Sequence, residues 1–440
     1  MAHLLYDKEW KDVLCRFCAT TCGKKGKTML KSIIRKEILS NLLSYKFSII
    51  TILSAILIFL SIFVMYRDYL LALDNYEILQ QEHEDFIAVI RPTPLSIFAR
   101  GLEENLCRSY ERGIGGQINA GRKQQSVNNL FRLFTAPDLL YIIKVILSLC
   151  AMLFAFDVVS GEKETGTLRQ SLSNSLKRPI LIFGKWLGGF ISFILPFFIA
   201  VLLGTIFVTL SPMVDMSVQD WANLGLFLLS SVIYLAVFFS LGLLISCLTH
   251  RSSTSLVISL FVWAILVFLI PNLGNILARQ LVRIPSLQYF KLKRDQAWVK
   301  EFFEENRAED YSERLEIRSR IKAESDKFTE DYRNHLNSLV RVFQNITRIS
   351  PAASFTFLAT DIMGTGMAEE RRLKRAVLQQ NNILEDWDEE KGNRPAFRYK
   401  RSSIKAVLGP GALSNCLILI LFNVLFFTGA HVAFLRYDVR

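Results

Sequence analysis

The chain has 440 residues, of which 51% are hydrophobic and 21% are charged, and its formal net charge is +12. The apolar residues are gathered into long blocks without charges, which excludes an ordinary soluble domain and indicates a polytopic membrane protein with sizeable aqueous parts. The basic residues crowd beside the apolar blocks, as is typical of cytoplasmic retention and contact with anionic lipid, so we expect no nucleic-acid partner.

Residues 1–27 are expected to form a polar cytoplasmic extension, and their length before the first apolar stretch argues against a signal peptide. Within them, Cys15, Cys18 and Cys22 have a spacing that can suggest a metal site. A fourth ligand is missing, however, so we expect reduced thiols and no metal.

The segment at 23–28, GKKGKT, ends like a phosphate-binding loop. The complete motif requires a glycine at position 21, where this chain has Thr21, and no buried strand precedes it. The apolar stretches offer no paired carboxylates, histidine ligands or activated nucleophile, which disfavours an intramembrane enzyme. We therefore expect no catalytic residue and no cofactor on this chain.

Residues 28–46 alternate apolar side chains with basic ones, and this pattern predicts an amphipathic helix lying in the lipid headgroup layer. We expect Lys31, Arg35 and Lys36 to be its membrane-interface residues. The alternative is a simple cytoplasmic extension of the first span.

Six apolar stretches are long enough to cross the hydrocarbon layer, so the predicted fold is an all-α polytopic membrane protein. The predicted spans are 47–66, 138–157, 186–210, 223–248, 254–275 and 412–435. Two long polar stretches, 67–137 and 276–410, are expected to be mainly helical insertions. We expect helix at 68–90 in the first, and one or two long amphipathic helices at 287–346 in the second.

Charge in the short segments predicts the orientation. The N-terminal arm, the loop at 158–185 and the turn at 250–252 are basic, whereas the loop at 211–222 carries Asp215 and Asp220. The positive-inside rule then places both termini in the cytoplasm and both insertions outside it. We expect a multi-pass protein of the plasma membrane, which is the bacterial inner membrane.

Three residues near the ends of the spans have structural interpretations. Lys144 interrupts the second span close to one end, where its side chain can snorkel to the headgroups; a role in a translocation path is the alternative. Gly184 and Gly188, four residues apart, indicate close helix packing.

The loop between the second and third spans carries the functional prediction. We expect Ser160 to cap a short helix, with Glu162 and Glu164 near the positive end of its dipole. Gly161 and Gly166 permit sharp changes of chain direction. A solvated loop without a partner is the alternative for the two glutamates.

After this turn, Leu168, Leu172 and Leu176 are spaced four residues apart, which places one apolar ridge on a short helix that ends before Pro179. Lys185 marks the return to the membrane. A membrane protein driven by an external motor requires a rigid surface lever of this kind, with polar groups that its partner can hold.

The run SGEKETGTLR at 160–169, followed by GKWLG at 184–188, resembles the signature of ABC-2-type transporter permeases. The resemblance implies that the acidic Gly-Thr-Leu segment is the coupling helix for a separate ATP-binding subunit, which would hold the ATP and magnesium. The implied coupling residues are Ser160, Gly161, Glu162, Glu164, Gly166, Thr167, Leu168, Leu172 and Leu176.

The resemblance also implies that the helix at 28–46 is the interface helix of that family, and that a second permease copy completes a homodimer or heterodimer. The two insertions make the chain more similar to gliding-motility-type permeases than to compact exporters. We expect a permease subunit that couples ATP hydrolysis on its partner to substrate movement. The alternative is an ATP-driven mechanotransmission or scaffold protein that acts on an envelope partner without transport.

Overall fold

The computed structural model describes residues 24–81, 86–102, 109–112, 118–120, 137–173, 177–284, 286–307, 310–385, 387, 395, 397–401 and 409–436. Within these ranges, six helical segments are long and apolar enough to cross a membrane: Tyr45–Gln81, Leu139–Glu164, Arg178–Thr209, Val218–Leu248, Ser252–Leu281 and Pro410–Leu435. The all-α fold with six spans is therefore confirmed, and each helical segment is longer than its predicted span. The expectations for Cys15, Cys18, Cys22 and Leu176 fall outside the described residues.

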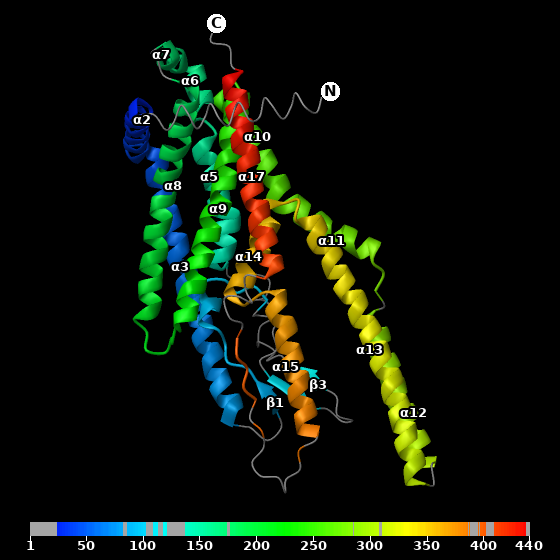
Figure 1. Cartoon of the computed structure of the whole chain (residues 1–440). Coiled ribbons are helices and arrows are strands. Elements are labelled where there is room, and N and C mark those ends of the chain that lie inside the picture. Colours follow the sequence, from blue (N-terminus) through cyan, green and yellow to red (C-terminus); the bar gives the residue numbers. More distant parts are fainter. Residues whose placement is uncertain are drawn as a thin grey trace.

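The spans form one bundle, preceded by helix α2 (Lys24–Leu42). They are built from α3 (Tyr45–Gln81); α4 (Leu139–Tyr141), the π-helical η3 (Ile142–Leu147) and α5 (Ser148–Ala155); α8 (Arg178–Thr209); α9 (Val218–Leu248); α10 (Ser252–Ala264), the π-helical η4 (Ile265–Leu269) and α11 (Ile270–Leu281); and α17 (Pro410–Leu435). Figure 1 shows α2 and the last turns of α17 at the same end of the bundle, together with the loop between α5 and α8. Because the number of spans is even, the chain ends on the side of the bundle where it began.

The core of the bundle lies around α9, which packs on α5, on α17 and on the short helix α14 (Pro351–Met363). The Tyr234 ring of α9 stacks on Phe355 of α14, with the ring centroids 4.3 Å apart. The Tyr234 hydroxyl donates to the carbonyl of Lys144 in η3 at 2.7 Å, and Ser350, which caps α14, donates to the carbonyl of Leu266 in η4. The carbonyl from η4 therefore holds the start of α14 directly, and the carbonyl from η3 holds the α9 tyrosine on which α14 stacks.

Helix α14 corrects one feature of the predicted second insertion. Residues 276–410 are expected to be aqueous, yet most of α14 is buried inside the bundle. Its sequence explains this, because it is apolar and both of its ends are satisfied locally. Ser350 accepts hydrogen bonds from Ala352 and Ala353, and Gly364 ends the helix with a φ of +69°.

The first insertion is only partly helical. α3 continues to Gln81, but a three-stranded antiparallel sheet follows, formed by β1 (Phe86–Val89), β2 (Ser109–Arg112) and β3 (Ile118–Ala120) in that order. The helix expected over 68–90 is therefore wrong at 86–89. There, pairing with β2 and packing against α15 (Met367–Glu385) favour the extended conformation of FIAV.

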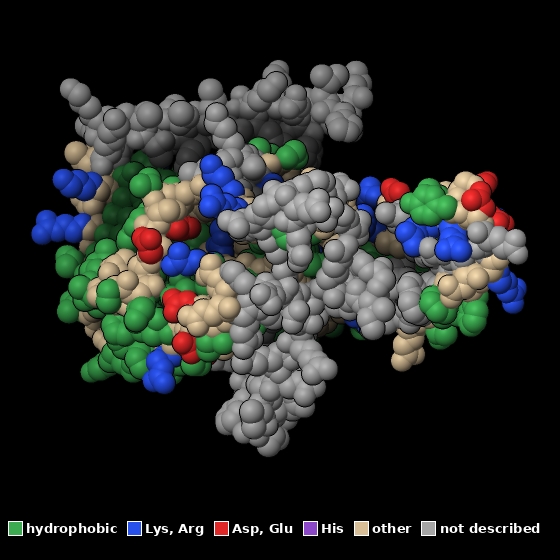
Figure 2. All heavy atoms as spheres, turned by 90° about the horizontal axis from the view of Figure 1, so that it is seen from below, with side chains coloured by type: hydrophobic (Ala, Val, Ile, Leu, Met, Phe, Trp, Pro, Cys, Tyr) green, Lys and Arg blue, Asp and Glu red, His purple; other side chains and the backbone are tan. Residues whose placement is uncertain are grey.

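The second insertion contains the two expected long helices, α12 (Leu287–Arg307) and α13 (Tyr311–Thr347), which pack on each other. α13 also packs on α11, and the pair projects away from the bundle (Figure 1). Seen from the end that carries the sheet, described hydrophobic side chains dominate the flank of the bundle, whereas acidic, basic and hydrophobic ones mix on the projecting pair (Figure 2).

Candidate functional site

The loop between α5 and α8 folds into two short helices, α6 (Ser160–Glu164) and α7 (Thr167–Ser173). They lie beyond the end of the bundle, near α2 (Figure 1). Gly166 separates them with a φ of +73°, in the left-handed region, and a Cβ there would meet nothing within 4 Å. Backbone conformation, and not crowding, therefore requires glycine at this turn.

Ser160 is buried at the start of α6, but it is not the helix cap that its position predicts. The N-cap is Val159, and the Ser160 hydroxyl donates instead to the carbonyl of Phe156 at 2.8 Å. The amide groups of Val159 and Ser160 both donate to the hydroxyl of Ser246 in α9, at 3.0 and 2.9 Å. The first turn of α6 is thereby fixed to α9, which supplies the partner that a capping side chain would otherwise provide.

Lys185 of α8 occupies the centre of this end of the molecule. Its side chain is 3% exposed, and its ammonium group lies 2.7 Å from Glu162 of α6 and 3.2 Å from Glu37 of α2. A buried ammonium requires such compensation, because desolvation strongly disfavours an unpaired charge. Three elements that are separate in the sequence are therefore joined at one cation.

A second set of contacts joins α6 to the turn between α9 and α10. Glu164 accepts hydrogen bonds from the backbone amide and the hydroxyl of Ser252, at 3.0 and 2.8 Å, at the first turn of α10. Lys163 donates to the carbonyls of Thr249, at 3.0 Å, and Cys247 at the end of α9. Each charge lies at the helix terminus whose dipole favours it.

α7 has a buried face and an exposed face. Leu168 is 1% exposed and packs in a cluster with Ile33 of α2, while Leu172 is half-buried beside it. Thr167, Arg169 and Gln170 are exposed. The expected apolar ridge is thus seen at its first two leucines.

α2 packs directly on α8 and is a helix separate from the first span. It ends at Leu42, and α3 begins at Tyr45. A Cβ on Gly184 would lie 2.7 Å from Cγ2 of Ile33, and one on Gly188 would lie 2.8 Å from Cβ of Glu37. The two glycines therefore allow close approach of the helices.

The three residues expected at the membrane interface, Lys31, Arg35 and Lys36, are exposed on α2. Lys46, at the start of α3, forms an ion pair with Asp157 and lies 5.0 Å from the centroid of the Phe156 ring. The basic segment ahead of the first span is therefore connected to the loop as well as to α8.

Sequence reasoning placed Glu162 and Glu164 in the loop but missed what they bind. Lys185 is interpreted there as a boundary marker, Ser252 only as part of a basic turn, and Glu37 is not considered. One signal was available: Glu37 is the single acidic residue in the basic stretch 28–46. An isolated carboxylate in a helix that approaches a span is a candidate partner for a lysine at that depth.

Among the described residues, no three His, Cys, Asp or Glu side chains are grouped as the ligands of a metal ion would be. The contacts at this end of the molecule are ion pairs and hydrogen bonds that connect helices. Such an arrangement can transmit a displacement from the loop to several spans.

A search among curated proteins finds no match to this chain. The family described as ABC-2 family transporter protein matches residues 31–439, which is nearly the whole chain and includes all six spans. The chain therefore belongs to the ABC-2 transporter family, as a multi-pass membrane protein.

Proposed function

We propose that this chain is the permease subunit of an ABC transporter, and that the exposed face of α7 is where a separate ATP-binding subunit docks. The supporting observation is that α6 and α7 have one side bound to the bundle and another that is exposed. Leu168, Lys163 and the two glutamates hold one side to the bundle. The polar face with Thr167, Arg169 and Gln170 is left for a partner.

A force applied to α7 would reach the spans through α6. The contact of Glu162 with Lys185 leads to α8 and onward to α2, and the contact of Glu164 with Ser252 leads to α10. The third and fifth spans would therefore move together when the partner closes on ATP and magnesium. Short helices tied by polar contacts transmit displacement because they cannot bend independently of the elements they bind.

The proposed orientation places α6, α7 and both termini in the cytoplasm of a bacterial cell, at the plasma membrane. The exposed basic side chains of Lys31, Arg35 and Lys36 would then meet the anionic headgroups of the inner leaflet. Only 11% of the fifth span is buried, compared with 72% of the fourth. Its free apolar face would contact lipid or a second permease copy, identical or related.

The second candidate function is mechanotransmission without transport, in which the chain moves an extracytoplasmic envelope partner. The projecting pair α12–α13 favours it, because α13 packs on α11, which continues the fifth span. Motion of that span would swing the pair. The size of the two insertions supports the similarity to gliding-motility-type permeases.

The docking proposal is tested by reversing charge on the exposed face of α7. Arg169→Glu with Gln170→Glu should abolish co-purification of the ATP-binding subunit and its stimulated ATP hydrolysis. Both side chains are exposed, so the fold should be unaffected. The matched control, Lys300→Glu with Gln296→Glu, changes exposed residues of α12 and should leave both readouts intact. Unchanged recovery of the ATP-binding subunit in the α7 variant would refute the proposed docking face.

The two candidate functions differ in vesicles that contain the assembled complex. Transport predicts ATP-dependent movement of an amphiphilic reporter across the bilayer. Mechanotransmission predicts no movement, together with ATP-dependent cross-linking from an exposed position such as Phe303 to one envelope protein. Reporter movement without such cross-linking would exclude the second candidate.

A further inference from the structure

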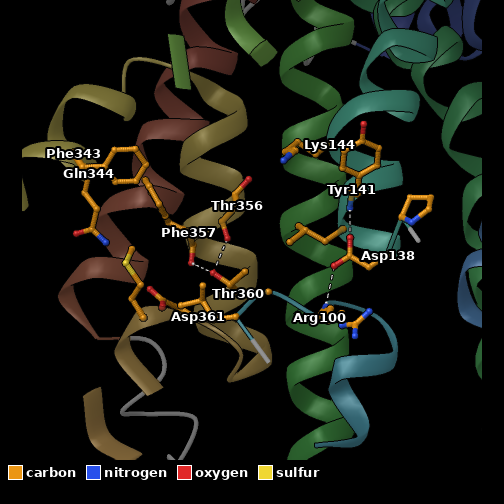
Figure 3. A pocket seen from close by; sticks show the side chains of 16 residues that line it. Arg100, Asp138, Tyr141, Lys144, Phe343, Gln344, Thr356, Phe357, Thr360 and Asp361 are labelled. Atoms are coloured by element: carbon orange, nitrogen blue, oxygen red, sulfur yellow. Dashed lines mark hydrogen bonds between the residues drawn. The ribbon is translucent and has the colours of Figure 1, made fainter. Parts of the chain in front are cut away.

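A cavity of about 810 Å³ lies between the start of the second span and helices α13 and α14. Figure 3 shows Arg100, Asp138, Tyr141 and Lys144 on one wall, and residues of α13 and α14 on the other. It lies toward the end of the bundle that carries the sheet, away from α6 and α7 (Figure 1). Its volume is within the range of small-molecule binding sites.

Most of the charged side chains in the cavity wall already have partners. The Arg100 guanidinium pairs with Asp68 at 3.1 Å. The Asp138 carboxylate caps α4, because it accepts hydrogen bonds from the amide groups of Tyr141 and Arg100, at 2.7 and 2.9 Å. Neither group therefore requires a ligand.

Asp361, on the opposite wall, accepts a hydrogen bond from the amide group of Ala368, and burial raises its pKa to about 6. Arg348, Arg371 and Arg372 lie close enough to oppose that rise. These groups compensate the burial only in part, so the carboxyl group is partly neutral near pH 6.

Lys144 is different, because no carboxylate among the described residues lies within ion-pair distance of its ammonium group. The ammonium group lies 5.6 Å from the centroid of the Tyr141 ring, and the Asp138 carboxylate acts on it only from beyond ion-pair distance. Figure 3 shows the side chain extending from η3 toward the cavity. One positive charge on the cavity wall is therefore left for an anion.

The rest of the lining suits a hydrocarbon chain. Leu140, Phe343, Phe357 and Met367 contribute apolar surface, and Tyr141 contributes an aromatic face beside the lysine. A lone cation at one side of an apolar cavity matches a molecule with one charged end and one apolar end.

We propose that this cavity binds an amphiphile with a single anionic headgroup, which Lys144 pairs while the hydrocarbon chain lies against Phe343 and Phe357. The inference deepens the proposed function, on which it rests, by assigning a class of substrate. It gives Lys144 a role other than snorkelling to the membrane surface.

The test uses the full chain purified in dodecyl maltoside, with native mass spectrometry to measure dissociation constants. The probes share one hydrocarbon chain: tetradecyl phosphate, monotetradecanoyl glycerol and tetradecyltrimethylammonium. We expect the phosphate to bind at least about tenfold more tightly than the other two, as a charge-assisted contact allows. Lys144→Gln should remove that preference.

Two further variants make the result specific. Lys293→Gln is the matched control, because Lys293 lies over the Tyr289 ring at 6.0 Å but outside the cavity, and it should retain the preference. Gln344→Trp fills the cavity from the opposite wall without altering Lys144, and it should block binding of the phosphate. If one cavity variant fails to fold, the other still tests the site.

The source of the amphiphile is distinguished in nanodiscs. If the occupant is a membrane lipid, discs of phosphatidylglycerol should compete with tetradecyl phosphate, and discs of phosphatidylcholine should not. If it enters from water, the phosphate should bind equally in both. Equal binding of the three probes in detergent, or retention of the preference in Lys144→Gln, would overturn the inference. Neither result depends on ATP, so the docking proposal would be unaffected.

Discussion

Two lysines in the spans of this chain meet opposite environments. Lys185, near the loop end, is 3% exposed and is held between Glu37 and Glu162. Lys144, nearer the other end, faces a cavity, and its ammonium group lies over the Tyr141 ring with no described carboxylate within ion-pair distance. The comparison indicates that the two lysines have different roles. The Lys185 charge fixes helices to one another where the partner would apply force, and the Lys144 charge remains available where a ligand would bind.

The largest expected difference is in stability. Lys185→Met leaves two glutamates without their shared cation, and breaking a buried ion pair in this way costs about 3–5 kcal/mol. Lys144→Met removes a charge that has no described carboxylate within ion-pair distance, so its cost should be below about 1 kcal/mol. Unfolding of both variants in mixed dodecyl sulfate and maltoside micelles measures the two values. If Lys144→Met and Lys185→Met lowered the free energy of unfolding equally, the proposed difference between the two lysines would be wrong.

Helix packing at the loop end gives the next effect. Gly184→Ala places a methyl group against Ile33, and overpacking of this kind costs about 1–3 kcal/mol. Gly225→Ala is the control, because a Cβ there meets nothing within 4 Å and alanine favours helix by up to about 1 kcal/mol. We predict that, in the same unfolding assay, Gly184→Ala lowers the free energy of unfolding and Gly225→Ala raises it. A neutral Gly184→Ala would mean that α2 is not held closely to α8.

A smaller effect depends on pH and concerns the cavity. Asp361 lies outside the six spans, and its pKa in the folded chain is raised from 3.8 to about 6. Between these values the folded state binds a proton that the unfolded state has lost. Stability should therefore fall by about 1 kcal/mol between pH 5 and pH 6, and level off above pH 7. Asp361→Asn should flatten this part of the profile, and an unchanged slope would show that another group titrates.

The sequence was sufficient to predict the six spans, a helix ahead of the first of them and the loop between the second and third. Long apolar blocks and charge at their ends determine these features locally. It also predicted the close packing at Gly184 and Gly188, since small residues at that spacing have few other uses in a span.

The partners of the glutamates could not be predicted in the same way. Glu37 and Glu162 are separated by more than a hundred residues of sequence, and only the packing of α2 and α6 around α8 brings both to Lys185. The burial of α14 was missed for a similar reason. Its cap on η4 and its stacking on Tyr234 are contacts with spans that come much earlier in the chain.

Site-specific photo-cross-linking tests the central claim most directly. A photoreactive residue at Gln170, on the exposed face of α7, should cross-link to the ATP-binding subunit in membranes. The same residue at Val218, which is 88% exposed at the start of α9 and at the other end of the bundle, should not. Cross-links to the ATP-binding subunit from Val218, or none from Gln170 in an active complex, would contradict the account.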